Sequence, residues 1–525
     1  MIKKLKNIFA RYPFSKLTNI RHQDIGETHT YTHKSAKEYF NELTHLAKTF
    51  DVNSLKVDDE YVWPYLRNRL WIQLFGISNN KMDRINFPST AVQKGSFRDL
   101  PLSSRNKLKS TFSALEINDI NETLTNVDFL FLTVINSSEQ TLLESGEIYH
   151  RITDPFYEIA KKVGTAKKIE ILKVKSKAIE KSVNYRHKVT HILTPTIFRH
   201  GYVGKIKFSN FLSQLKKHIP SLNHNGLQLR ESIDWELHTR DFYIELLQKI
   251  NPKIVLLNGF HYQAPLISAC HSLNITSVDI QHGIQVGWNP LYNDWNEMPE
   301  EGYQGVPNHF FVWGRKELFS INKVFTGTKH SPILTGFPWL EKQLELTDNL
   351  QEKYIQKFNK YRVKVLLVLQ KQPEVPKLFK DLIENSPDDY LWIIRHHPKG
   401  SKFTLKDFTS SSQKNVLTDK YIDNVTLPHI FKHVNIAVSE GSTVASEADY
   451  FGLYNFIFSS KGRSNYVKEI KDGHFFYINK YQEFYSKIKI LDLTNKISRA
   501  NLYEKVNIEN VFEELLMNKK RENEK

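Results

Sequence analysis

The segment 439–448 has the residue pattern with the clearest chemical meaning in the chain. It reads Ser-Glu-Gly-Ser-Thr-Val-Ala-Ser-Glu-Ala and directly follows the apolar run 434–438. A strand that ends in small residues predicts a turn into a helix, and the first backbone N–H groups of a helix favour an anion. A carboxylate one turn inside that helix can accept hydrogen bonds from sugar or ribose hydroxyls. The pattern therefore predicts a site for a phosphate-bearing, nucleotide-linked ligand, formed by Glu440, Gly441, Ser442, Thr443 and Glu447.

A basic stretch, Arg395-His396-His397-Pro398-Lys399, follows the apolar run 390–394. Its side chains donate hydrogen bonds, and an arginine can bind a phosphate through two parallel ones. We expect this stretch to contact the same phosphate; a packed histidine pair in a surface loop is the alternative interpretation. No further ligand stands at a spacing typical of zinc sites, so we expect no metal here.

A histidine also follows a predicted strand in the first half of the chain, where Gln281-His282-Gly283 comes after the run 276–280. Such a histidine has a pKa suited to removing a proton from a hydroxyl, and Gly283 lets a ligand approach the backbone closely. Most lone histidines are structural, which is the alternative interpretation. Other candidates on the acceptor side or as the catalytic base are His261, Glu144, Glu147 and Asp154.

Apolar runs alternate with helical patterns from about residue 121 onward, which predicts an α/β fold. The expected strands are 127–134, 168–172, 253–259, 276–280 and 309–313 in the first half, and 363–369, 390–394, 436–438 and 455–458 in the second. Expected helices between them include 154–160, 241–250, 261–273, 376–384 and 443–451. Ligands bind at the carboxyl ends of strands in such folds, and each motif above follows a predicted strand.

Four parts are expected along the chain. Residues 1–120 form a helical N-terminal extension, because 39–47 and 65–75 have the apolar spacing of helices. Residues 121–335 form a Rossmann-like acceptor domain and 336–500 a Rossmann-like donor domain, with a glycine- and proline-containing hinge at 333–338. Residues 501–525 form a C-terminal helix or tail.

The composition narrows the classes of protein. The 525 residues include one cysteine, Cys270, so no intrachain disulfide or cysteine cluster can form, which fits a cytoplasmic protein. No run reaches the roughly 20 apolar residues that span a bilayer. The net charge of +16 implies attraction to an anionic partner. The basic segment from Lys3 to Arg21 predicts either peripheral docking on an anionic membrane surface or an ordinary surface helix.

The three motifs, in this order across two Rossmann-like halves, resemble the GT-B glycosyltransferases of bacterial surface-polysaccharide assembly. Capsule and O-antigen transferases and the teichoic-acid glycerophosphotransferases share this pattern. The resemblance implies two domains that face a cleft, His282 as the base, Arg395 and His397 on the donor phosphate, and Glu447 on the donor ribose or sugar. Two departures are that no Thr-Pro follows the His-Gly pair and that 440–443 reads Glu-Gly-Ser-Thr instead of Asp-Tyr-Ser-Ser.

The resulting hypothesis is a glycosyltransferase that moves a sugar from a nucleotide-activated donor to a bacterial surface glycan acceptor, free or lipid-linked. It needs no cofactor other than its nucleotide-sugar substrate and no obligate metal ion, and it works in the cytoplasm or on the inner face of the membrane. One alternative is a nucleotide-sugar 2-epimerase. Another is a non-enzymatic basic protein that binds membrane or nucleic acid, although no recognition helix or basic–aromatic array predicts a nucleic-acid partner.

Overall fold

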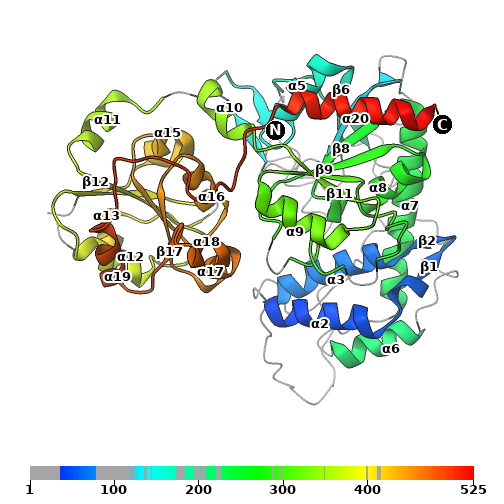
Figure 1. The fold of residues 1–525 in the computed structure, drawn as a ribbon, viewed down its shortest axis with the longest axis horizontal. Helices are drawn as coiled ribbons and strands as arrows, with labels where there is room; N and C mark the ends of the chain where they lie inside the picture. The colour runs from blue at the N-terminus through cyan, green and yellow to red at the C-terminus, as the bar shows by residue number, and fades with distance from the viewer. Residues whose placement is uncertain are drawn as a thin grey trace, which may run out of the picture. The chain divides into compact units, whose positions relative to one another are not determined.

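The structure is a computed structural model. It describes residues 36–78, 120, 124–134, 139–143, 145–172, 184–193, 202, 209–219, 226–286, 289–295, 298–347, 349–397, 400–410 and 415–524. Two large parallel sheets organise this part of the chain (Figure 1).

The first sheet has seven strands in the order β11-β10-β9-β8-β3-β6-β7, and all its neighbours pair in parallel. The chain builds outward from β3 in one direction and then, from β8, in the other. The order therefore reverses between β3 and β8, which is where ligands bind in open α/β sheets. The strands are β3 (Phe129–Val134), β6 (Ala166–Leu172), β7 (Thr190–Leu193), β8 (Ile254–Asn258), β9 (Thr276–Ile280), β10 (His309–Val312) and β11 (Ser331–Leu334).

Both faces of this sheet are covered. In β3, Phe129 and Phe131 belong to one apolar cluster and Leu130 and Leu132 to another, because successive side chains of a strand point to opposite faces. A strand buried on both faces reads as a continuous apolar run, which explains why it was recognisable in the sequence. The covering helices are α5 (Asp154–Val163), α7 (Gly226–Ile250), α8 (Ala264–Ser272), α9 (Arg315–Phe325) and α20 (Ile508–Asn523), whereas α6 (Ser209–His218) packs against α2 (Ala36–Thr49).

The last helix, α20, returns to the first sheet and lies beside α5 (Figure 1). Phe512 of α20 is fully buried, and its ring centroid lies 5.0 Å from that of Phe129. The C-terminal helix is therefore part of the core of the first domain.

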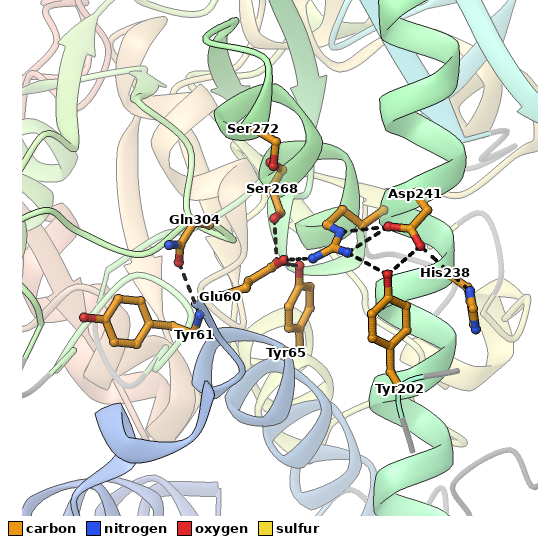
Figure 2. A network of polar contacts seen from close by, with 10 residues as sticks. Glu60, Tyr61, Tyr65, Tyr202, His238, Asp241, Ser268, Ser272 and Gln304 are labelled. Atoms are coloured by element: carbon orange, nitrogen blue, oxygen red, sulfur yellow. Dashed lines mark hydrogen bonds and ion pairs between the residues drawn. The ribbon is translucent and has the colours of Figure 1, made fainter. Parts of the chain in front are cut away.

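The N-terminal helices α2 (Ala36–Thr49) and α3 (Trp63–Ser78) also pack into the core of the first domain, with the short strands β1 (Lys56–Val57) and β2 (Glu60–Tyr61) between them. Figure 2 shows the polar network that joins β2 and α3 to α7 and α8: Glu60 of β2 accepts hydrogen bonds from Tyr65, Ser268 and Arg240. Because a buried carboxylate is costly unless it is paired, this network fixes β2 and α3 against the sheet's helices.

The second sheet has six parallel strands in the order β14-β13-β12-β15-β16-β17. Its order reverses between β12 and β15. The strands are β12 (Val363–Val368), β13 (Tyr390–Arg395), β14 (Val416–Leu417), β15 (Ile436–Ser439), β16 (Tyr454–Ile457) and β17 (Phe475–Tyr477). The helices around it include α12 (Lys377–Glu384), α14 (Lys420–Asn424), α15 (Leu427–Phe431), α16 (Thr443–Tyr450), α17 (Ser460–Asn465), α18 (Val467–Lys471) and α19 (Tyr481–Ile488).

The prediction of an α/β fold with two Rossmann-like domains is confirmed. The sequence did not predict the edge strands β7, β11, β14 and β17 or the hairpin of β4 (Gln140–Leu142) and β5 (Ile148–His150). Part of the expected hinge at 333–338 is strand, since β11 pairs with β10. Cys270 is buried, as expected for a core residue.

Among the described helices, none combines the length and the apolar character needed to cross a bilayer. The segment from Lys3 to Arg21, for which membrane docking was considered, lies outside the described residues. The expected domain boundaries stay predictions.

Candidate functional site

A polar cluster lies at the carboxyl ends of β3, β8 and β9, where the strand order of the first sheet reverses. Glu139 follows β3, and its Oε2 accepts a hydrogen bond from Asn258 Nδ2 at 2.6 Å. The same carboxylate oxygen lies 3.4 Å from Nε2 of His150, which ends β5. His261 and His282 come from the loops after β8 and β9. The topology therefore brings a carboxylate, an amide and three imidazoles together at the carboxyl ends of these strands.

Three aromatic rings in this cluster surround one point. The ring centroids of His261 and His282 are 6.0 Å apart with nearly parallel planes, and Tyr262 lies 4.0 Å from His261. Gly259 has a φ of +73°, which a glycine adopts at no steric cost. A Cβ at Gly259 would lie 3.6 Å from His282 Cε1, 3.7 Å from Tyr262 Cδ2 and 3.8 Å from His261 Cε1. All three rings therefore lie at van der Waals distance from the position that a side chain would take at Gly259.

Burial sets the charges in the cluster. It lowers the pKa of His261 to about 3 and the pKa of His282 below its usual value, so both imidazoles are neutral near pH 7. Burial alone would raise the pKa of Glu139, but the hydrogen bonds with His150 and Asn258 help to lower it below its usual value. Within the described residues, Nδ1 of His261 has no hydrogen-bond partner, whereas His282 interacts with the backbone of Ile280. An ionised carboxylate thus accompanies two neutral imidazoles.

Buried polar contacts hold the loops that carry these histidines. Gln281 is fully buried; its Oε1 accepts the backbone N–H of Trp313 at 2.7 Å and its Nε2 donates to the carbonyl of Gly283 at 2.9 Å. Asp279 accepts the backbone N–H of Phe260 and the hydroxyl of Tyr292, each at 3.1 Å. Gln281 and Gly283 therefore fix the backbone around His282, and Asp279 fixes the turn that carries His261.

Of the three other acidic residues predicted as a base, two lie within the described residues and have different surroundings. Asp154 is buried in an ion pair with Lys168, and it accepts the backbone N–H of His150 at 2.8 Å. Glu147 accepts hydrogen bonds from Arg186 and Ser145, each at 2.9 Å, on the hairpin side of the domain. Asp154 supports the cluster through the backbone of His150, whereas no described contact joins Glu147 to His282. Glu144 lies outside the described residues.

Sequence reasoning missed Glu139 and His150. Glu139 is the first acidic residue after β3, five positions before Glu144. That position was the available signal, but the pairing of β3 with β8, which brings Glu139 to Asn258, is not visible in the sequence.

In the second domain, the turn between β15 and α16 has the form that the sequence predicted. Gly441 has a φ of +94°, and Ser442 caps α16 by accepting the backbone N–H of Val444 at 3.4 Å. The backbone N–H groups of Ser442 and Thr443 have no hydrogen-bond partner among the described residues. The turn thus presents two N–H groups at a helix N-terminus, where the helix dipole favours an anion.

The carbonyl groups of Glu440, Gly441 and Ser442 each accept a hydrogen bond from a residue in or next to α17. The Glu440 carbonyl accepts the hydroxyl of Ser459, the Gly441 carbonyl accepts Asn465 Nδ2 at 3.3 Å, and the Ser442 carbonyl accepts the Tyr466 hydroxyl at 2.8 Å. These three bonds fix the orientation of the peptide groups, so that the N–H groups of Ser442 and Thr443 are preorganised.

Glu447 lies one turn into α16 and is partly buried. Burial raises the pKa of its carboxyl to about 7, against a hydrogen bond from Thr443 that lowers it. The carboxyl group therefore changes its protonation state near neutral pH.

The basic stretch after β13 has mainly structural partners. One guanidinium nitrogen of Arg395 donates to the carbonyls of Ile422 and Val425, and burial lowers the pKa of Arg395 to about 10. His396 is buried; its Nδ1 lies 3.1 Å from the carboxylate of Asp423, and its Nε2 accepts the backbone N–H of Phe403 at 3.0 Å.

Three positions of this stretch remain: His397, Pro398 and Lys399. His397 is partly buried, and Lys399 lies outside the described residues. No group of three or more His, Cys, Asp and Glu side chains is arranged to hold a metal ion within the described part of the chain.

No protein-family model and no curated protein sequence matches the chain. One similar solved structure is UDP-GlcNAc 2-epimerase from Neisseria meningitidis bound to UDP-GlcNAc, with 14% identity, coverage of 74% of this chain and 100% of that chain, and a TM-score of 0.42. A second is UDP-GlcNAc 2-epimerase from Methanocaldococcus jannaschii, with 12% identity, coverage of 74% and 98%, and a TM-score of 0.43. A third is a variant of the wall teichoic acid polymerase TagF, with 12% identity, coverage of 83% and 98%, and a TM-score of 0.40. Because these TM-scores are below 0.5, the two parallel sheets themselves, and not these similarities, establish the fold.

Proposed function

We propose that the protein is a glycosyltransferase that moves a sugar from a nucleotide-activated donor to a hydroxyl group of a bacterial surface glycan. The observation that carries this proposal is the turn 439–443. Its carbonyl groups accept hydrogen bonds from residues in or next to α17, and the N–H groups of Ser442 and Thr443 have no partner among the described residues. Such an arrangement suits the diphosphate of a nucleotide sugar.

On the donor side, the N–H groups of Ser442 and Thr443 bind the phosphate next to the sugar and stabilise the charge that develops as the bond to the anomeric carbon breaks. Glu447, as the carboxylate, accepts hydrogen bonds from hydroxyls of the ribose or the sugar. Arg395 positions the segment 422–425, and His396 positions the backbone at Phe403. His397 and Lys399 are the residues of the basic stretch that we assign to the phosphate.

On the acceptor side, the neutral imidazole of His282 takes the proton from the attacking hydroxyl, and Glu139 stabilises the imidazolium that forms. The hydroxyl oxygen forms the new bond to the anomeric carbon, and the nucleoside diphosphate leaves with the electron pair of the broken bond. This direct displacement inverts the anomeric centre. The proposal requires the two domains to face a common cleft that aligns the substrates and excludes water.

Two experiments test the proposal. A thermal-shift panel of UDP, CMP, GDP and CDP compounds identifies the nucleotide, since a ligand that binds only the native state raises the melting temperature. Transfer from the matching nucleotide sugar is then measured for His282→Ala and Glu447→Ala, with Glu147→Ala as the matched control. We expect the first two folded variants to lose at least about 100-fold in rate and the control to retain it. Wild-type rates in both variants would contradict the assigned roles.

The second candidate function is nucleotide-sugar 2-epimerisation, which uses the same donor side without an acceptor. Incubation with UDP-sugars alone distinguishes the two, because only an epimerase converts the donor in the absence of a glycan. The place of action, in the cytoplasm or on an anionic inner membrane surface, belongs to the same proposal. Deletion of residues 1–21 would abolish binding to anionic liposomes if the segment from Lys3 to Arg21 docks there.

A further inference from the structure

Tyr262 is an exposed aromatic residue at the edge of the histidine cluster. It is 64% exposed, whereas Phe260, two residues earlier in the same turn, is fully buried. A single exposed aromatic residue needs no explanation by itself. The ring of Tyr262, however, has its centroid 4.0 Å from that of His261, and like the ring of His282 it lies against Gly259. The exposed ring and the proposed base therefore lie on the same glycine, next to each other.

The turn that carries Tyr262 is firmly held. The backbone N–H of Tyr262 donates to the carbonyl of Gly259 at 2.9 Å, and the side chain of Gln263 donates to the carbonyl of Asn258 at 2.9 Å. The carboxylate of Asp279 accepts a hydrogen bond from the backbone N–H of Phe260 at 3.1 Å. Because the backbone is already fixed, a ligand that stacks on Tyr262 orders little besides one side chain.

The chemistry of a sugar ring fits this position. The face of a phenol ring carries negative charge, and one face of a pyranose presents C–H groups that pack against it. A phosphate is a poor fit, since the same strand-end cluster contains the carboxylate of Glu139, which has a lowered pKa and is ionised. An acyclic polyol offers no flat apolar face to an aromatic ring. The surroundings of Tyr262 thus favour an uncharged cyclic sugar.

We propose that Tyr262 is the platform on which the terminal pyranose ring of the acceptor stacks, so that one of its hydroxyl groups points towards His282. This inference rests on the proposed glycosyltransferase function and adds to it the acceptor class: a cyclic sugar end and not a polyol-phosphate end.

Saturation-transfer NMR on the full-length protein tests the inference with defined probes: methyl glucoside, methyl galactoside, methyl N-acetylglucosaminide and glycerol 3-phosphate. We expect at least one glycoside to bind the wild-type protein and glycerol 3-phosphate not to bind. Tyr262→Ala should weaken glycoside binding by about three- to tenfold, the range expected for an aromatic stacking contact, and Tyr262→Phe should retain it. The matched control is Phe319→Ala on α9, which removes a ring of similar exposure, 65%, and should change nothing.

Three results would overturn the inference: no glycoside bound by the wild-type protein, equal binding by the folded Tyr262→Ala variant, or binding of glycerol 3-phosphate alone. The thermal-shift response to nucleotides, measured on the same variants, keeps this test separate from the proposed function. If no nucleotide shifts the wild-type protein, the donor assignment fails, while the glycoside measurements still decide the role of Tyr262. Melting temperatures of the unliganded variants confirm that each is folded.

Discussion

Replacing Gly441 with alanine tests the close packing behind the donor turn. The residue has a φ of +94°, and a Cβ there would lie 2.3 Å from Cα of Gly462. A left-handed backbone costs an alanine about 1–2 kcal/mol. Two carbon atoms at optimal contact are about 3.5–4.0 Å apart, so the turn or α17 must move by more than 1 Å, and such overpacking costs typically about 1–3 kcal/mol more. We expect Gly441→Ala to lower the free energy of unfolding by about 2–5 kcal/mol.

Gly473 provides a matched control in the same domain. It also has a positive φ, +77°, but a Cβ there would meet nothing within 4 Å. Gly473→Ala should therefore cost only the backbone term of about 1–2 kcal/mol. The difference between the two variants isolates the contact with Gly462.

The assay measures both stability and nucleotide affinity for the two variants. Denaturant unfolding, followed by circular dichroism, gives the stability difference, and calorimetric titration gives the affinity for the nucleotide identified by thermal shift. A shift of about 1 Å in a positioned group can cost up to about 100-fold in function, so Gly441→Ala should bind at least tenfold more weakly, while Gly473→Ala should bind like the wild type. Equal stability and equal affinity in the two variants would refute the packing argument.

Two further predictions concern the same turn. Tyr466→Phe removes the hydroxyl that donates a hydrogen bond to the Ser442 carbonyl. We therefore expect the free energy of unfolding to fall by about 1 kcal/mol and the nucleotide affinity, measured by titration, to be several-fold weaker. Unchanged affinity would show that this hydrogen bond does not orient the turn. The pKa of Glu447 is raised to about 7, and only its carboxylate form is a pure hydrogen-bond acceptor. Nucleotide affinity should therefore rise between pH 6 and pH 8 in the wild type, and its pH profile should be flatter in Glu447→Gln. Parallel pH profiles of the two proteins would contradict this role.

The sequence predicted the central strands well and the edge strands poorly, for a physical reason. Strand 276–280 matches the prediction residue for residue, and 363–369 and 390–394 each differ by one residue at one end. These strands are covered on both faces and read as apolar runs. The missed strands β7, β11, β14 and β17 lie at the four sheet edges, where strands are shorter or partly exposed.

The candidate site was predictable in its residue types but not in its partnerships. The rule that ligands bind after strands located His282 and the 439–447 turn. It did not find Glu139, because the contact with Asn258 depends on β3 and β8 being neighbours. The sequence also gave no sign that Arg395 serves backbone carbonyls, since those carbonyls lie 27 and 30 residues further along the chain.

Hydrogen–deuterium exchange of the peptide 439–447 tests the central claim most directly, because bound phosphate would protect the backbone N–H groups of Ser442 and Thr443. The measurement compares the free protein with the protein saturated by the nucleotide that raises its melting temperature. The account predicts slower exchange in this peptide, and a smaller effect in Gly441→Ala at the same nucleotide concentration. Unchanged exchange there, with protection in another part of the chain, would contradict it.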